Sequence, residues 1–202
     1  MYEIVDNTLL KTRVRYSSGP LRVITTFVTS MRSLFQDNND FNQYIANWDV
    51  SNVTDMSLMF SEAVSFNQDL NYWDVSNVTN MGAMFNMAES FNGNISSWDV
   101  SNVENMGYMF TQAIEFNGDI SNWNVEKVKS MISMFQLAKA FNQDLSKWNV
   151  GNVTNMTKMF YAAFMFNQDL SSWNVGNVNT CVLFSDNASS WSLPKPNLTC
   201  EQ

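Results

Sequence analysis

The chain has 202 residues, with 11 Lys and Arg against 19 Asp and Glu, so its formal net charge is −8. Because nucleic acids and anionic membrane surfaces are bound mainly by basic residues, this charge argues against both partners. The sequence holds no histidine, which removes the commonest general base and most zinc sites. We therefore expect no nucleic-acid partner and, since no apolar run reaches the roughly 18 residues of a membrane span, no membrane insertion.

Residues 1–27 do not share the pattern of the rest of the chain, and we expect them to form an N-terminal cap. Positive charge is concentrated between Lys11 and Arg15. The first residues lack the basic and apolar regions of a secretory signal peptide. The expectation is that the protein is not secreted or that a signal has been removed.

From residue 28 onward the sequence repeats every 25 residues without an insertion. Phenylalanine, valine and methionine each keep this period in their own columns, and so does tryptophan. One unit cannot bury its own apolar face, so such units stack and share a continuous core. We predict a repeat solenoid of about six coils over residues 28–178, with an internal tryptophan ladder. The ladder consists of Trp48, Trp73, Trp98, Trp123, Trp148 and Trp173.

Two shorter periods coexist within each unit. Met56, Met59, Phe60 and Ala63 have the i, i+3, i+4, i+7 spacing of one helical face, which predicts a short helical or 3₁₀ turn. Alternation of apolar and polar residues predicts a short strand within Leu70–Val75. The predicted class is therefore an α/β repeat solenoid, and an all-β solenoid is the alternative.

A column of asparagines recurs at a polar corner of each unit. An amide side chain can donate and accept at once, so stacked asparagines can satisfy the backbone of turns in successive coils. A structural ladder is the favoured interpretation, and a ligand-binding row is the alternative. The column consists of Asn42, Asn67, Asn92, Asn117, Asn142 and Asn167.

The unit Phe-Asn-Gln-Asp-Leu-Ser-x-Trp-x-Val-x-Asn-Val-Thr-x-Met-x-x-Met-Phe resembles the BspA-like bacterial surface-protein repeat, and the likeness covers residues 28–184. That repeat is a relative of leucine-rich repeats and also occurs in mycoplasma lipoproteins. The resemblance implies a right-handed coil like that of leucine-rich repeats, capped at both ends. It also implies an extracellular or cell-surface location, with a signal or anchor outside this chain, and a role in adhesion or protein binding without catalytic residues.

Residues 179–202 break the repeat, and we expect them to form a C-terminal cap. The chain has two cysteines, Cys181 in a core column and Cys200 in the cap. A disulfide between them would close a loop of about 20 residues and add about 3 kcal/mol in the chain-entropy model. Such a bond would agree with an oxidising compartment, and two unpaired thiols are the alternative.

Ligand binding is expected where the repeat varies, because the constant columns are needed for the core. Aromatic side chains at outward positions are of the type enriched at protein interfaces. The alternative is that these positions vary because nothing selects them. The candidate binding residues are Tyr44, Tyr72, Tyr108, Tyr161 and Phe164.

Two columns of carboxylates are the candidate metal ligands, since calcium takes six to eight oxygen ligands. A column with one acid per coil, in which asparagine replaces some of the acids, more often caps turns. We therefore expect no cofactor, and structural calcium is the alternative. Acids repeated in most coils do not define a single active site, so we expect no enzyme. The columns are Asp69, Asp119, Asp144 and Asp169, and Asp49, Asp74 and Asp99.

The sequence thus predicts a non-enzymatic recognition or adhesion module. It would present a rigid face to a protein or glycan on another cell or host surface. The alternative is a structural spacer or fibre segment that forms homo-oligomers. Ice or mineral binding is less favoured, because the threonine row that begins with Thr54 and Thr79 is broken at Glu104 and Lys129.

Overall fold

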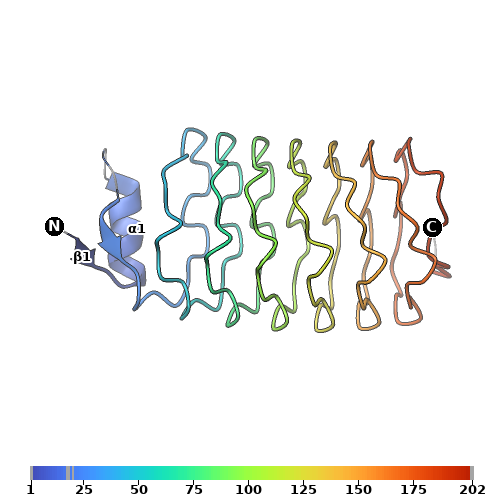
Figure 1. Ribbon diagram of the computed structural model, residues 1–202, viewed down its shortest axis with the longest axis horizontal. Coiled ribbons are helices and arrows are strands. Elements are labelled where there is room, and N and C mark those ends of the chain that lie inside the picture. Colours follow the sequence, from blue (N-terminus) through green and yellow to red (C-terminus); the bar gives the residue numbers. More distant parts are fainter. Residues whose placement is uncertain (1, 17–18, 20, 201–202) are drawn as a thin grey trace.

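The computed structural model describes residues 2–16, 19 and 21–200. After a small cap, the chain winds as a row of similar turns along the long axis of the molecule, and the two termini lie at opposite ends (Figure 1). The two predicted caps, 1–27 and 179–202, each contain a few residues outside the described part. No helix among the described residues has the length and apolar character needed to cross a membrane.

The N-terminal cap holds the only helix and strands assigned in the described residues. They are β1 (Glu3–Ile4), α1 (Asn7–Tyr16) and β2 (Val23–Ile24). The two strands are parallel, with Glu3 opposite Val23 and Ile4 opposite Ile24. The cap therefore lays an extra pair of strands and a helix against the first turn of the stack (Figure 1).

Helix α1, which the repeat-based prediction did not contain, begins at an aspartate that acts as its N-cap. The Oδ1 atom of Asp6 accepts hydrogen bonds from the backbone N–H of Thr8 at 3.0 Å and of Leu9 at 2.8 Å. Such a cap satisfies backbone donors that have no partner inside the helix. Val5 and Leu10 are buried, so the apolar side of the cap is joined to the core of the stack.

Successive units lie against one another and are joined by parallel backbone bridges between residues 25 positions apart. Beside each bridge, backbone N–H groups of one unit donate to carbonyls of the next, as from Met56 to Asn80 at 3.0 Å and from Leu58 to Gly82 at 2.9 Å. These bonds pair buried backbone groups that would otherwise be costly to desolvate. The bridging residues are Ser30, Asp55, Asn80, Asn105, Ser130, Asn155 and Thr180.

The helical turn predicted over Met56–Ala63 does not form. The segment is instead a succession of tight turns, and its backbone φ angles are positive at Leu58 (59°) and Glu62 (64°). A left-handed residue every fourth position interrupts a right-handed helix. Met56, Met59, Phe60 and Ala63 still point inward. The turn repeats after four residues, so Phe60 takes the same place in the second turn as Met56 in the first, and Ala63 the same place as Met59.

The strand predicted within Leu70–Val75 is also absent, and a turn occupies 71–72. The backbone N–H of Trp73 donates to the Leu70 carbonyl of the same unit at 3.0 Å, a local bond that a strand does not make. Strand-like pairing between units occurs in the column of Asp55 and Asn80 instead. The alternation of apolar and polar residues predicted which side chains are buried, but it did not predict the conformation of the backbone.

The inside of the stack is a set of ladders of like side chains. The ladder tryptophans expose only 3–5% of their surface. The Trp98 ring is parallel to that of Trp73, with 6.5 Å between centroids, and lies 6.2 Å from that of Trp123. Its Nε1–H donates to the Leu70 carbonyl of the preceding unit at 2.9 Å. Trp73, Trp123, Trp148 and Trp173 make the equivalent bond, so these indoles contribute both apolar burial and a bond between units.

Two phenylalanine columns fill the space beside the tryptophans. Phe85 and Phe91 of one unit stack with 3.9 Å between ring centroids, and Phe85 lies 5.7 Å from Phe110 of the next unit. The methionine columns of Met81 and Met84 are fully buried. The core is thus continuous from one unit to the next.

The positive-φ positions give a stability prediction, because glycine is absent from all of those found in the described residues. Left-handed backbone costs an L-residue about 1–2 kcal/mol, whereas glycine adopts it freely. Ala83 has a φ of 56°. We expect Ala83→Gly to raise the free energy of unfolding by about 0.5–1 kcal/mol in urea denaturation. The matched control is Ala88→Gly, at a buried position without positive φ, which should lower it; a loss for both variants would contradict the assignment of strain.

Candidate functional site

The asparagine column forms a continuous chain of hydrogen bonds on the outside of the stack. The Oδ1 atom of Asn67 accepts the backbone N–H of Asn92 at 2.9 Å, and equivalent bonds of 2.8–3.0 Å link the other members. At the last unit, Asn167 Oδ1 accepts from Ser192 at 2.8 Å and Leu193 at 3.0 Å in the C-terminal cap. The oxygens of this column therefore have a structural role.

The amide nitrogens of the same column are not used in this way. Asn67 and Asn92 are exposed, and their Nδ2 groups make no hydrogen bond with the described part of the chain. They remain available as donors on the molecular surface, at fixed positions, because the Oδ1 bonds hold the side chains.

Two of the predicted binding residues, Tyr44 and Tyr72, lie together. The Nε1–H of Trp73, the residue after Tyr72, donates to the carbonyl of Ile45, the residue after Tyr44, at 3.2 Å, so the two tyrosines belong to adjacent units. Tyr44 is 70% exposed and Tyr72 is 88% exposed. Both tyrosines line one open hollow on the surface.

The rest of this hollow is mainly polar. Asn67, Gln68, Asp69 and Asn92 supply polar side chains, and Ala46 and Gly93 complete the lining, with Gly93 packed closely against the Gln68 carbonyl. The Nε2–H of Gln68 donates to the Asn42 side chain at 2.8 Å, and Asp69 Oδ1 accepts the backbone N–H of Asn94 at 2.7 Å. One oxygen of each of these two side chains, Gln68 Oε1 and Asp69 Oδ2, is left without a bond among the described residues. We call this surface the Tyr44–Tyr72 hollow.

The other three predicted binding residues lie elsewhere. Tyr108 is 44% exposed and borders a separate, more apolar hollow with Leu58 and Ile132. Tyr161 is half-buried, and the Nζ of Lys158 lies 5.9 Å from its ring centroid. Phe164 is 38% exposed. The structure therefore does not gather the five candidates into one site.

The sequence analysis missed several exposed apolar side chains, one of them within the repeat units. Met165, beside Phe164, is 57% exposed. It lies in a column that holds Ser65, Ser90 and Glu115 in earlier units, so comparing residue types down that column was the signal that could have found it.

The members of the predicted carboxylate columns cap turns, except Asp69, which accepts a bond from the next unit. In Asp49, Oδ1 accepts hydrogen bonds from both the hydroxyl and the backbone N–H of Ser51, and the same arrangement recurs at Asp74 with Ser76. Within the described residues, no group of three or more His, Cys, Asp or Glu is placed to hold a metal ion. These bonds account for the carboxylates as local structure.

Hydrogen bonding lowers the pKa of several of these carboxyl groups. The hydroxyl of Ser51, then its backbone N–H, lowers the pKa of Asp49, and Ser101 acts in the same way on the pKa of Asp99. Donors stabilise the charged form of a carboxylate, which is the physical cause. The pKa is lowered similarly in Asp119, Asp144 and Asp169.

These shifts set a direction for the pH dependence of stability. A carboxyl whose folded-state pKa lies below its unfolded value stabilises the fold above about pH 4, and this contribution is lost as the pH falls through the folded value. We expect the melting temperature to fall below about pH 4. Later units hold Asn124 and Asn149 in the column of Asp99, with Oδ1 accepting the same backbone bond at 3.1 and 3.2 Å. The double variant Asp49→Asn/Asp99→Asn should therefore fold and lose less stability in acid; an acid profile identical to that of the parent chain would contradict this account.

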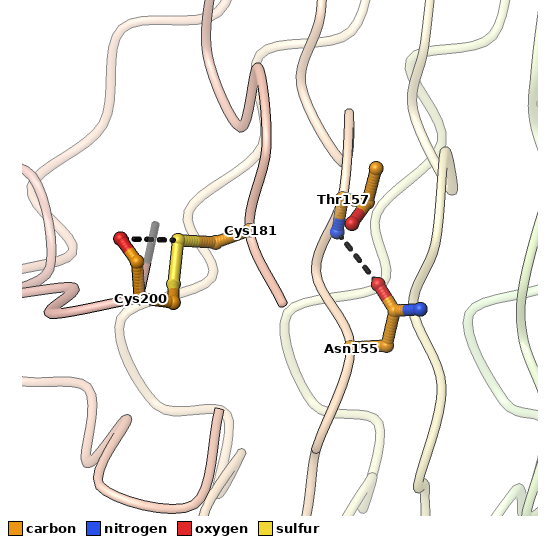
Figure 2. The surroundings of a disulfide bond; sticks show 4 residues. All are labelled: Asn155, Thr157, Cys181 and Cys200. Carbon is orange, nitrogen blue, oxygen red and sulfur yellow. Dashed lines mark hydrogen bonds between the residues drawn. A yellow bond between two sulfur atoms is a disulfide. The ribbon is translucent and has the colours of Figure 1, made fainter. Parts of the chain in front are cut away.

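The two predicted disulfide cysteines are bonded to each other, with 5.9 Å between their Cα atoms. Figure 2 shows the bond beside Asn155 and Thr157 of the preceding unit, where Asn155 Oδ1 accepts the Thr157 backbone N–H at 2.9 Å. Cys181 is fully buried. The bond thus joins the buried core of the last unit to the C-terminal segment.

The repeated columns and the bridges between units define this chain as a repeat protein. Residues 22–114 and 93–194 match the model of a family described as Mycoplasma protein of unknown function, DUF285, and the chain belongs to that family. No significant match is found among curated proteins or among solved structures. The description of the family gives no activity, so the function has to be argued from the surface.

Proposed function

We propose that this chain is a non-enzymatic recognition or adhesion module that binds a protein or glycan through the variable outward positions of its stacked units. In this proposal the stack is a right-handed coil akin to the BspA-like and leucine-rich repeats, and it works outside the cell or at the cell surface. The family match supports a repeat protein. The Cys181–Cys200 disulfide supports an oxidising compartment, where such bonds persist.

The observation that carries the proposal is the placement of exposed aromatic side chains at positions that other units fill with polar ones. Tyr44 stands in a column that otherwise holds aspartate or asparagine, and Tyr72 in one that otherwise holds serine, asparagine or lysine. Exposing a large aromatic ring gives no packing energy to the stack, whereas aromatic residues are enriched at binding hot spots. The core does not require these two departures from the repeat.

A mixed array of proteins and glycans tests this function. We expect the folded chain to bind at least one class of probe on the array. A variant in which the outward aromatics take residues from their own columns, Tyr44→Asp, Tyr72→Ser, Tyr108→Ser and Phe164→Lys, should bind at least tenfold more weakly, which corresponds to about 1.4 kcal/mol. Absence of binding to every probe, or equal binding by this folded variant, would contradict the proposal.

A second function, a spacer or fibre segment that self-associates, is favoured by apolar side chains on the N-terminal cap. Ile4 and Ile24, opposite each other in β1 and β2, are 59% and 40% exposed, and Phe27 is 66% exposed. Contiguous exposed apolar groups mark interaction surfaces. This function predicts concentration-dependent oligomers in sedimentation velocity that are lost in Ile4→Ser/Phe27→Ser; a monomer at all concentrations would exclude it.

A further inference from the structure

From the geometry of the Tyr44–Tyr72 hollow we infer that its ligand is a neutral, hexose-containing glycan, whose sugar rings stack on the two tyrosines while its hydroxyl groups bond to the surrounding amides and carboxylate. This inference rests on the proposed recognition function and assigns to it a site and a class of ligand.

The first support is the pair of exposed aromatic rings. Tyr72 has the most exposed large apolar side chain recorded in the described residues, at 88%, and Tyr44 follows at 70%. The C–H groups of a pyranose ring are weakly positive, and they pack well on the negative face of an aromatic ring. Two such rings, from adjacent units, offer a surface for more than one sugar residue.

The second support is the balance of donors and acceptors between the tyrosines. Asn67 and Asn92 offer Nδ2–H donors, while Gln68 offers Oε1 and Asp69 offers Oδ2 as acceptors. Each sugar hydroxyl can both donate and accept, so a hydroxyl-rich ligand satisfies all four groups. In each of these four side chains the second polar atom is hydrogen-bonded to the stack. These bonds fix the orientation of the unbonded donor or acceptor before a ligand arrives, and this reduces the entropy cost of binding.

The third support is charge and size. The residues that line the hollow include Asp69 and no Lys or Arg, and the chain carries a net charge of −8. An anionic sugar or a phosphate group would be repelled here. The open hollow has a volume of about 440 Å³, within the roughly 300–1,000 Å³ typical of small-ligand sites. It lacks the deep apolar pocket that anchors a hydrophobic side chain of a protein partner.

The repeat itself supplies variants that should fold. Tyr44→Asp introduces the residue found at Asp119, Asp144 and Asp169, and Tyr72→Ser introduces the residue found at Ser97 and Ser172. Tyr72→Phe keeps the ring and removes only the hydroxyl. Phe27→Ser is the matched control, because it removes an exposed aromatic ring that does not line the hollow.

The experiment uses immobilised neutral oligosaccharides of glucose, galactose and mannose, together with sialylated and sulfated oligosaccharides and a panel of proteins. We expect binding to a neutral oligosaccharide, with Tyr44→Asp and Tyr72→Ser each weakening it about tenfold. Tyr72→Phe and Phe27→Ser should change it less than twofold. Circular dichroism and thermal melting confirm that each variant is folded.

Four results would overturn the inference. Binding only to charged oligosaccharides, binding only to a protein, or neutral-glycan binding that is unchanged in folded Tyr44→Asp and Tyr72→Ser would each rule out this ligand at this hollow. Binding only to charged oligosaccharides, or only to a protein, leaves the recognition function standing. Unchanged neutral-glycan binding also leaves it standing if Tyr108→Ser or Phe164→Lys weakens that binding. A chain that binds no probe on the array overturns both the inference and the proposed function.

Discussion

Replacing Trp98 with alanine is expected to lower the free energy of unfolding by about 3–5 kcal/mol, the range found for buried aromatic residues. The Trp98 side chain is 3% exposed, and its ring stacks between Trp73 and Trp123. Removing it leaves a cavity that the neighbouring units cannot fill, because their own ladder positions are fixed. It also removes the Nε1–H bond to the Leu70 carbonyl of the preceding unit. Urea denaturation monitored by circular dichroism measures the loss.

The control for Trp98→Ala is the exposed aromatic next to the same ladder. Tyr72→Ser removes a large ring that is 88% exposed, and surface substitutions of this kind usually change stability by less than about 0.5 kcal/mol. Comparable losses in the two variants, or an unchanged denaturation curve for Trp98→Ala, would contradict a buried tryptophan ladder.

Replacing Cys200 with serine is expected to lower the free energy of unfolding by about 3 kcal/mol under oxidising conditions. Cys181 and Cys200 are bonded across a sequence separation of 19 residues. The bond restricts the unfolded chain, and it also holds the C-terminal segment against the unit that contains Cys181. Thermal melting of both proteins with and without reductant measures the effect.

The reductant is the internal control of this experiment. With dithiothreitol present, the parent chain should melt close to Cys200→Ser, because both then lack the bond. A loss of the same size in reducing and in oxidising buffer would show that the serine disturbs packing, and that the disulfide contributes little.

The burial of the ladders could be read from the sequence, but the backbone could not. A strict period of 25 residues requires equivalent positions to meet, so Trp98 was expected beside Trp73 and Trp123 in the interior, and the structure places it there. The helical turn over Met56–Ala63 was wrong because i, i+3, i+4, i+7 spacing also fits a pair of four-residue turns. Non-glycine residues such as Leu58 rarely adopt positive φ, so nothing in the residue types indicated those turns.

The candidate site was predictable only in part. The sequence singled out Tyr44 and Tyr72 as departures from polar columns, yet the two columns differ and their proximity depends on the path of the turns. In the structure both tyrosines line one hollow, and a one-dimensional pattern does not contain the path of the turns that brings them there. The free donor of Asn67 was likewise hidden, since the same column was expected to be satisfied by the stack itself.

Shielding of the tryptophans from solvent tests the central claim, that 25-residue units stack around shared interior ladders. All seven tryptophans of the chain, including Trp191 in the C-terminal cap, are at most 7% exposed. The native protein should therefore show the blue-shifted emission of buried indoles and weak quenching by acrylamide, and both should change to those of free tryptophan only on unfolding in urea. Native emission at the wavelength of solvated tryptophan, with strong quenching, would contradict the stacked arrangement.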